Sequence, residues 1–154
     1  MSIKNGKGVY NSGVLTQEQI GQIGEYCKEK PVEVVYLFGS QADGTARPDS
    51  DYDFGVLFDD KLSSGERFDL KLDLMDFFGG VTHAGNKVDV VDLNSAPIRF
   101  QYEAIKCRRD IFVRSRRVRD NFEYGTLVRY GDEMFFMKQV LRDRTRYMAK
   151  YGFQ

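Results

Sequence analysis

The stretch from Leu37 to Phe58, LFGSQADGTARPDSDYDFGVLF, constrains the fold more than any other part of the chain. An apolar segment ends at Gly39-Ser40, and ten residues later Asp51 and Asp53 stand directly before a second apolar segment. Side chains alternate across a strand, so both aspartates point to one face and Phe54 points to the other. Two carboxylates at the start of a buried strand must either have their charges neutralised or have a functional role.

The remaining sequence predicts alternating strands and helices. Segments rich in β-branched and aromatic residues predict strands at 32–38, 51–58, 87–93 and 110–115. Helices are expected at 15–30, 63–78, 97–107 and about 119–150. Residues 1–14 are expected to be loosely held, with at most a short strand near Val9.

Local signals set the expected helix ends. Thr16 and Ser63 each precede a Gln or Glu at capping-box spacing. Gly79-Gly80 is expected to end the second helix. Pro97 opens the third, with Asn94 or Ser95 as its cap. Two glycines inside the last helix, Gly125 and Gly131, are its expected weak points.

The chain is the length of one domain. Its 154 residues predict a single domain over 1–154, with a core at about 32–114 and a C-terminal helical segment at about 119–150. The connection between the first two strands is too long for a tight hairpin and too short for a crossover helix. We therefore expect an α/β (α+β) fold, a small mixed sheet with helices packed on one side.

A third carboxylate, Asp89, lies in the strand predicted at 87–93. If that strand neighbours 51–58, Asp89 joins Asp51 and Asp53 at one end of the sheet. Three clustered carboxylates resist joint ionisation, and a divalent cation removes their repulsion. Mg²⁺ is the expected ion, because it prefers oxygen ligands and leaves positions for water and phosphate.

Gly39-Ser40 completes a candidate phosphate site. Glycine lets the backbone approach a phosphate closely, and the N–H groups that follow would face the anion. Arg47 and Ser50, from the loop before Asp51, are further candidate nucleotide-binding residues. Each feature alone has a simpler explanation: a plain turn, a capping aspartate, or an Asp89 paired with an arginine. Together they favour a reaction in which a nucleophile attacks a nucleoside triphosphate and two metal ions assist the attack.

These residues resemble a known family. Gly-Ser, ten residues and Asp-x-Asp is the pattern of the polymerase-beta-like nucleotidyltransferases, and SDYDFGVLF is similar to their SDxDxxV strand. KVDVVDLNSAPIRFQYEAI resembles the third-carboxylate strand and helix of the minimal nucleotidyltransferases (MNT), the MntA-like antitoxins of HEPN/MNT toxin–antitoxin pairs. The resemblance covers about residues 34–113.

The resemblance implies a function and a set of residue roles. Gly39 and Ser40 would hold the triphosphate of ATP, Asp51 and Asp53 would ligate Mg²⁺, and Asp89 would ligate the catalytic metal or act as base. The implied reaction is transfer of AMP from ATP to a hydroxyl, most simply a tyrosine of a HEPN toxin. One departure is Asp43, where the family pattern has a basic or neutral residue.

Two other functions fit the same pattern. The chain would neutralise a HEPN partner by binding alone, or it would modify a small molecule of the aminoglycoside type. The second alternative predicts an additional helical substrate domain, and the sequence shows none.

Composition narrows the possible partners and locations. A formal net charge of zero argues against a general nucleic-acid binder. No run approaches the roughly 18 apolar residues of a membrane span. Cys27 and Cys107 lack metal-site spacing, so a cytoplasmic protein is expected. The single histidine, His83, lies in the loop-like GGVTHAGN and predicts a plain exposed residue.

Two segments in the C-terminal part of the sequence are candidate contacts for a partner molecule. RRDIFVRSRRVR is either a solvated basic face or a contact for phosphates, RNA or an acidic partner. YGDEMFFMKQV is either core or a surface for a partner or a second copy. Phe135 and Phe136 are adjacent, so they cannot both face one core stripe.

Overall fold

The computed structural model describes residues 15–152, so the expected strand near Val9 lies outside the described residues. Five helices and four strands follow one another in this part of the chain. Their bounds are α1 (Gln17–Lys28), β1 (Val32–Phe38), α2 (Ser40–Asp43), β2 (Tyr52–Phe58), α3 (Ser64–Thr82), β3 (Val88–Asp92), α4 (Ile98–Lys106), β4 (Arg109–Val113) and α5 (Arg116–Tyr151).

The strands form one mixed sheet in the order β3-β2-β1-β4. β1 pairs antiparallel with both β2 and β4, whereas β2 pairs parallel with β3. The predicted mixed sheet is confirmed. Because β2 and β3 run in the same direction, both enter the sheet at the same end, and the carboxylates at their starts lie together.

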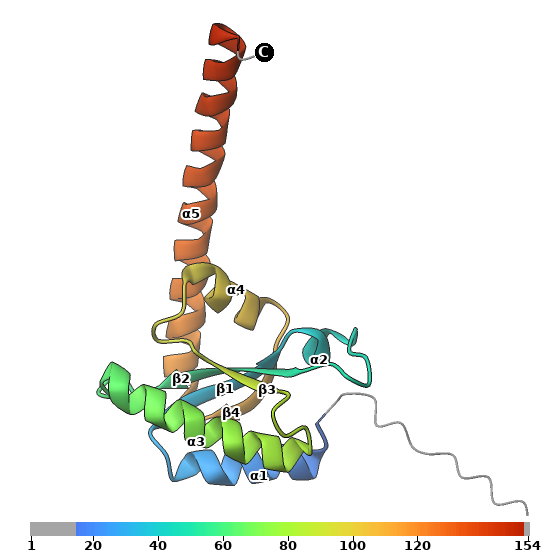
Figure 1. Cartoon of the computed structure of the whole chain (residues 1–154). Helices are drawn as coiled ribbons and strands as arrows, with labels where there is room; N and C mark the ends of the chain where they lie inside the picture. Colours follow the sequence, from blue (N-terminus) through green and yellow to red (C-terminus); the bar gives the residue numbers. More distant parts are fainter. Residues whose placement is uncertain (1–14, 153–154) are drawn as a thin grey trace, which may run out of the picture.

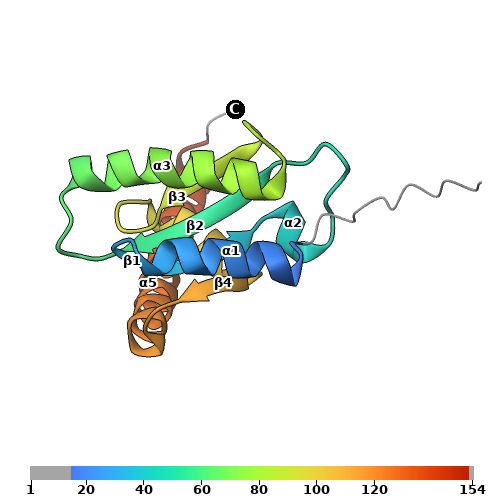
Figure 2. The same ribbon diagram turned by 90° about the horizontal axis from the view of Figure 1, so that it is seen from below.

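Helices cover both faces of the sheet, and not one face as expected (Figures 1 and 2). α1 and α3 lie across one face, over a core that includes Val35 and Phe54. α4 and the start of α5 cover the other face, over Val34 and Tyr36. β1 carries buried side chains on both faces, and such a strand requires cover on each side.

The N-terminal caps follow the prediction, whereas the end of α3 does not. Thr16 and Ser63 both form complete capping boxes. α3 continues through Gly79-Gly80 to Thr82, and His83 ends it in the left-handed conformation. A β-carbon on Gly79 would lie 2.5 Å from the Gly85 carbonyl oxygen. Gly79 therefore permits a close backbone approach within the helix and does not end it.

The start of α4 also differs from the prediction. Pro97 occupies the cap position, without a side-chain hydrogen bond to the helix. Asn94 instead accepts from the Phe58 N–H at 2.8 Å and donates to the Phe58 carbonyl at 3.0 Å. The Ser95 hydroxyl donates to Asp92 at 2.8 Å. Asn94 therefore secures the β3–α4 turn to β2, Ser95 bonds back to the end of β3, and neither side chain caps α4.

α5 is one continuous helix of 36 residues that begins at Arg116, three residues earlier than predicted. Gly125 and Gly131 do not interrupt it. Its first turns pack beside α4, and its C-terminal half projects away from the sheet (Figure 1). Across residues 15–152, no helix combines the length and the apolar character that crossing a membrane requires.

Candidate active site

The phosphate turn lies at the end of β1. Gly39 stands immediately before α2 with φ 69° and ψ −154°, a conformation that only glycine adopts readily. Its carbonyl accepts from the N–H groups of Ala42 and Asp43, at 3.0 and 3.1 Å. The N–H groups of Ser40 and Gln41 precede these and have no acceptor within the helix. They are the backbone donors that a phosphate would use.

The carboxylates gather on the neighbouring strands. Asp53 of β2 is the register partner of Asp89 of β3, so the two side chains share one face of the sheet. Asp51 lies one pleat repeat before Asp53. Burial raises the pKa of Asp53 first, and the negative charges of Asp89 and Asp51 raise it further. The structure therefore brings the three predicted carboxylates within mutual electrostatic reach.

The turn and the Asp53 carboxylate are in direct contact. A β-carbon on Gly39 would lie 2.6 Å from Oδ2 of Asp53, well inside van der Waals distance. A phosphate held by the turn would therefore lie beside the Asp53 carboxylate of β2. This is the arrangement that the spacing of LFGSQADGTARPDSDYD predicts.

The three carboxylates suit a Mg²⁺ ion that takes only some of its ligands from the protein. In the described part of the chain, none of the three carboxylates forms an ion pair. Among residues 15–152, no group of three His, Cys, Asp or Glu side chains closes around one point. Mg²⁺ commonly takes one or two carboxylates and completes its shell with water and substrate phosphates. Asp51, Asp53 and Asp89 suit that open kind of site.

Asp43, the departure from the family pattern, is held at the end of α2. Its carboxylate accepts from the Thr45 N–H at 2.9 Å and the Thr45 hydroxyl at 2.6 Å. These hydrogen bonds, and more weakly the charge of Lys106, lower its pKa. Asp43 thus stabilises the loop after α2, and the charge of Lys106 partly compensates the charge of Asp43.

Arg47 and Ser50 line a cavity of about 340 Å³ together with Tyr52 and Lys87. Gly39 and the three carboxylates are not part of its lining. Tyr52 belongs to the face of β2 opposite Asp53 and packs against the α1–α3 core. The Ser50 hydroxyl accepts from the Arg47 N–H at 2.7 Å, which shapes the loop. A nucleotide role for these two residues stays a prediction. His83 lines the same cavity and is exposed, as expected.

A hollow of about 320 Å³ lies beside Gly39 and was not predicted from the sequence. Its wall joins the end of β1 to the outer face of α4, and includes Phe38, Phe100 and Lys106. The available signal was Phe100 itself, an aromatic side chain next to the buried Gln101 on a short amphipathic helix. Its meaning depends on where α4 packs, and the sequence does not give that position.

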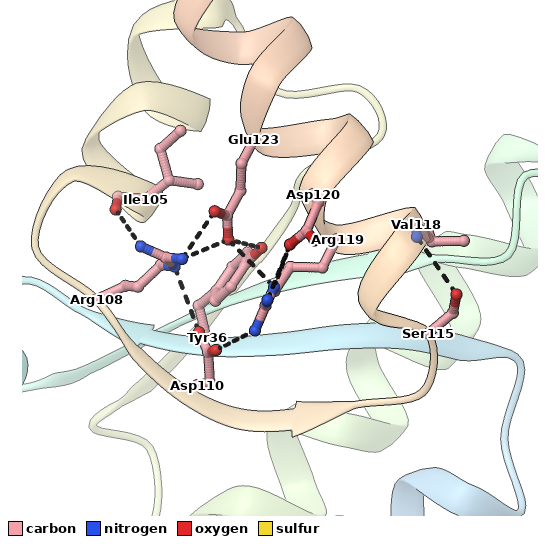
Figure 3. A network of polar contacts seen from close by, with 9 residues as sticks. All are labelled: Tyr36, Ile105, Arg108, Asp110, Ser115, Val118, Arg119, Asp120 and Glu123. Carbon is pink, nitrogen blue, oxygen red and sulfur yellow. Dashed lines mark hydrogen bonds and ion pairs between the residues drawn. The ribbon is translucent and has the colours of Figure 1, made fainter.

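The arginine-rich segment is largely structural (Figure 3). Arg108 donates to Glu123 at 2.7 Å, and Arg119 donates to Asp110 at 2.8 Å. The Tyr36 hydroxyl also donates to Glu123, at 2.8 Å. Arg114 donates to the backbone carbonyls of Val32, Cys27, Lys28 and Lys30. Among residues 15–152, no such bond is seen for three exposed arginines of the segment, Arg109, Arg116 and Arg117.

A glycine turn after one strand, two carboxylates at the start of the next strand and a third carboxylate one strand beyond are typical of the nucleotidyltransferase class. The chain belongs to the Polymerase beta, Nucleotidyltransferase family, whose model matches residues 21–117. No curated protein matches the sequence.

Solved structures of toxin–antitoxin complexes share the fold. A toxin–antitoxin with AMP-PNP has a TM-score of 0.62 at 23% identity, over 82% of this chain and 98% of that one. The Y104A mutant of a MntA-HepT toxin–antitoxin gives 0.63 at 22%, over 85% and 98%. The MNT antitoxin complex with a tri-AMPylated HEPN toxin of Shewanella oneidensis gives 0.56 at 20%, over 82% and 98%.

Proposed function

We propose that this protein is a Mg²⁺-dependent nucleotidyltransferase that transfers AMP from ATP to a tyrosine hydroxyl of a HEPN-type partner, and so acts as an antitoxin. The observation that carries the proposal is the contact between Gly39 and Asp53, with Asp89 beside Asp53. The fold relatives support the acceptor and the nucleotide, since they include a complex with AMP-PNP and a tri-AMPylated HEPN toxin.

The proposed reaction joins the acceptor oxygen to the α-phosphorus of ATP and breaks the bond from that phosphorus to pyrophosphate. The N–H groups after Gly39 orient the phosphates, and Asp51 and Asp53 hold the cation. Asp89 lies on the edge strand β3, where it receives the proton of the incoming hydroxyl. Mg²⁺, when bound, offsets the carboxylate charges and the charge that develops on the phosphate oxygens.

Radiolabelled ATP tests this proposal directly. Incubation of the protein with ATP labelled at the α-phosphate, Mg²⁺ and the purified HEPN-type partner should label the partner. The Asp51→Asn/Asp53→Asn protein should transfer no label. Equal labelling by that variant, or no labelling by the natural sequence, contradicts the proposal.

Neutralisation by binding alone is the second candidate, favoured by the exposed apolar side chains of the projecting half of α5. They are Phe135, Phe136, Met137, Val140, Leu141 and Met148. The two candidates separate in cells that produce the toxin. If the carboxylate variant binds the partner but no longer protects the cells, binding alone is excluded.

A further inference from the structure

The cavity of about 340 Å³ beside the loop before β2, which we call the loop cavity, is separate from the proposed catalytic residues. Its lining comes from that loop, from the end of α3 and from the segment just before β3. Tyr52 lines it from the face of β2 opposite Asp53. The volume lies within the usual range of small-ligand pockets, roughly 300–1,000 Å³. The loop cavity is therefore large enough for a small molecule.

The lining of the loop cavity carries positive charge. Arg47 and Lys87 belong to the lining, and no Asp or Glu side chain does. Among residues 15–152, neither of the two cations forms an ion pair with a carboxylate. The Lys87 ammonium donates to the backbone carbonyl of Asp49 at 3.4 Å. Because the chain as a whole has no net charge, two unpaired cations at one cavity favour an anionic ligand. Phosphate is the anion that arginine and lysine both bind well.

Gln41 adds an unsatisfied acceptor to the same lining. Its side chain is buried, with only 4% of the residue exposed. The amide nitrogen donates to the Ser50 carbonyl at 3.2 Å, which fixes the orientation of the amide. The amide oxygen Oε1 is buried, and nothing in the described part of the chain donates to it. Buried polar atoms nearly always have a partner, so this oxygen requires a donor such as a hydroxyl group.

The C-terminal end of α3 also borders the loop cavity, and helix carbonyls at such an end carry partial negative charge. Two of these carbonyls already have donors. The Gly80 carbonyl accepts from the His83 N–H at 3.3 Å, and the Val81 carbonyl accepts from the Gln19 amide at 2.9 Å. These bonds reduce the repulsion that an anion in the cavity would otherwise meet.

We propose that the loop cavity binds a hydroxylated phosphate monoester of the sugar-phosphate class. The phosphate group contacts Arg47 and Lys87, and a hydroxyl group of the ligand donates to Oε1 of Gln41. The proposal goes beyond the proposed function, because it requires neither ATP nor a HEPN-type partner. It gives Arg47 a ligand other than the nucleotide.

A ligand in this position would link two segments that precede catalytic carboxylates. Residues 44–50 connect α2 to Asp51, and Lys87 lies two residues before Asp89. A molecule that contacts both Arg47 and Lys87 would hold the loop against the start of β3. The amide hydrogens of residues 44–50 should therefore exchange more slowly when the ligand is bound.

Titration calorimetry with ribose 5-phosphate in the absence of Mg²⁺ tests the proposal. This compound should bind to the natural protein. Inorganic phosphate and ribose should each bind at least about tenfold more weakly, because each lacks one of the two kinds of contact. Ribose 5-phosphate should also slow the hydrogen exchange of residues 44–50.

Lys87→Gln tests the cationic contact. The variant should bind ribose 5-phosphate about 10- to 100-fold more weakly, as expected for the loss of one hydrogen bond to a charged group. Lys87→Arg should restore binding. The matched control is Lys61→Gln, an exposed lysine outside the lining, which should bind like the natural protein. Lys87→Gln should bind ATP with Mg²⁺ normally, and the Asp51→Asn/Asp53→Asn protein should bind ribose 5-phosphate normally.

Four results would overturn the proposal. The first is no binding of ribose 5-phosphate at millimolar concentrations. The second is equal binding by Lys87→Gln and Lys61→Gln. The third is equal binding of inorganic phosphate and ribose 5-phosphate, which would mean that the hydroxyl groups make no contact. The fourth is loss of ATP binding in Lys87→Gln, which would assign the cations to the nucleotide. An absence of AMP transfer would contradict the proposed function alone.

Discussion

Gly39 and Asp53 touch so closely that a β-carbon on Gly39 would lie 2.6 Å from Oδ2 of Asp53. This contact joins the end of β1 to the start of β2, and it explains why the phosphate turn contains glycine. Two independent constraints act there, because Gly39 also has a positive φ of 69°. An alanine would be strained by its own backbone and would displace the carboxylate.

Gly39→Ala should therefore lower both stability and ATP binding. The backbone strain costs about 1–3 kcal/mol of unfolding free energy. Displacement of Asp53 should weaken the binding of ATP with Mg²⁺ at least about tenfold, or about 1.4 kcal/mol. Urea denaturation and calorimetric titration measure the two effects. The control is Gly21→Ala in α1, where an added β-carbon meets nothing within 4 Å and no loss is expected. Unchanged ATP binding by Gly39→Ala would contradict the role of the contact.

Asp53→Asn should lower the rate of AMP transfer and raise the stability of the fold. The folded state raises the pKa of Asp53, so its ionised form destabilises the fold at neutral pH. This cost disappears as the pH falls through the raised pKa toward the ordinary value of 3.8. The variant should therefore melt at a higher temperature than the natural protein at pH 7, and the difference should shrink toward pH 4. AMP transfer should fall at least about 100-fold.

Thermal melts with and without Mg²⁺ complete this experiment. Mg²⁺ should stabilise the natural protein more than Asp53→Asn, because the ion relieves the repulsion that the substitution already removes. Asp69→Asn, on the exposed surface of α3, serves as the control. It should change neither the pH dependence nor the Mg²⁺ dependence of the melting temperature. A variant that melts lower than the natural protein at pH 7 would show that repulsion at Asp53 is not the dominant effect.

The candidate site was largely predictable, because it depends on short spacings. The period of two along a strand places Asp51 and Asp53 on one face, and parallel pairing of β2 with β3 adds Asp89. The surroundings depended on long-range packing. No local signal showed that β1 is buried on both faces, that Gly79 approaches the Gly85 carbonyl, or that Phe100 faces a hollow.

Gly79 and Gly80 should respond in opposite directions to alanine. A β-carbon on Gly79 would lie 2.5 Å from a backbone oxygen, so Gly79→Ala should cost about 1–3 kcal/mol through overpacking. A β-carbon on Gly80 meets nothing within 4 Å, so Gly80→Ala should stabilise α3 by about 0.5–1 kcal/mol. The two adjacent substitutions are each other's control in urea denaturation. Equal effects would mean that α3 ends at these glycines, as the sequence alone predicts.

Glu123 should be the most sensitive residue of the arginine network. It accepts from the Tyr36 hydroxyl and from Arg108, both at the junction of the sheet with α5. Glu123→Ala leaves a buried hydroxyl and a guanidinium without their acceptor, which should cost about 2–4 kcal/mol of unfolding free energy. The matched control is Glu25→Ala, which breaks the exposed pair with Lys28 and should cost less than about 1 kcal/mol. Similar losses in the two variants would show that the network is only a solvated surface.

The projecting half of α5 should carry the contact with the HEPN-type partner. Phe135 and Phe136 are 66% and 67% exposed, and their burial in a complex would remove a large apolar surface from water. Phe136→Ser should weaken partner binding about 30-fold, the loss of about 2 kcal/mol expected for an aromatic hot spot. ATP binding should not change, because the residue belongs to the C-terminal half of α5, which projects away from the sheet (Figure 1). Phe68→Ser on α3 is the exposed-aromatic control. If both serine variants bind the partner as tightly as the natural protein does, the contact lies elsewhere, and neutralisation through α5 loses its support.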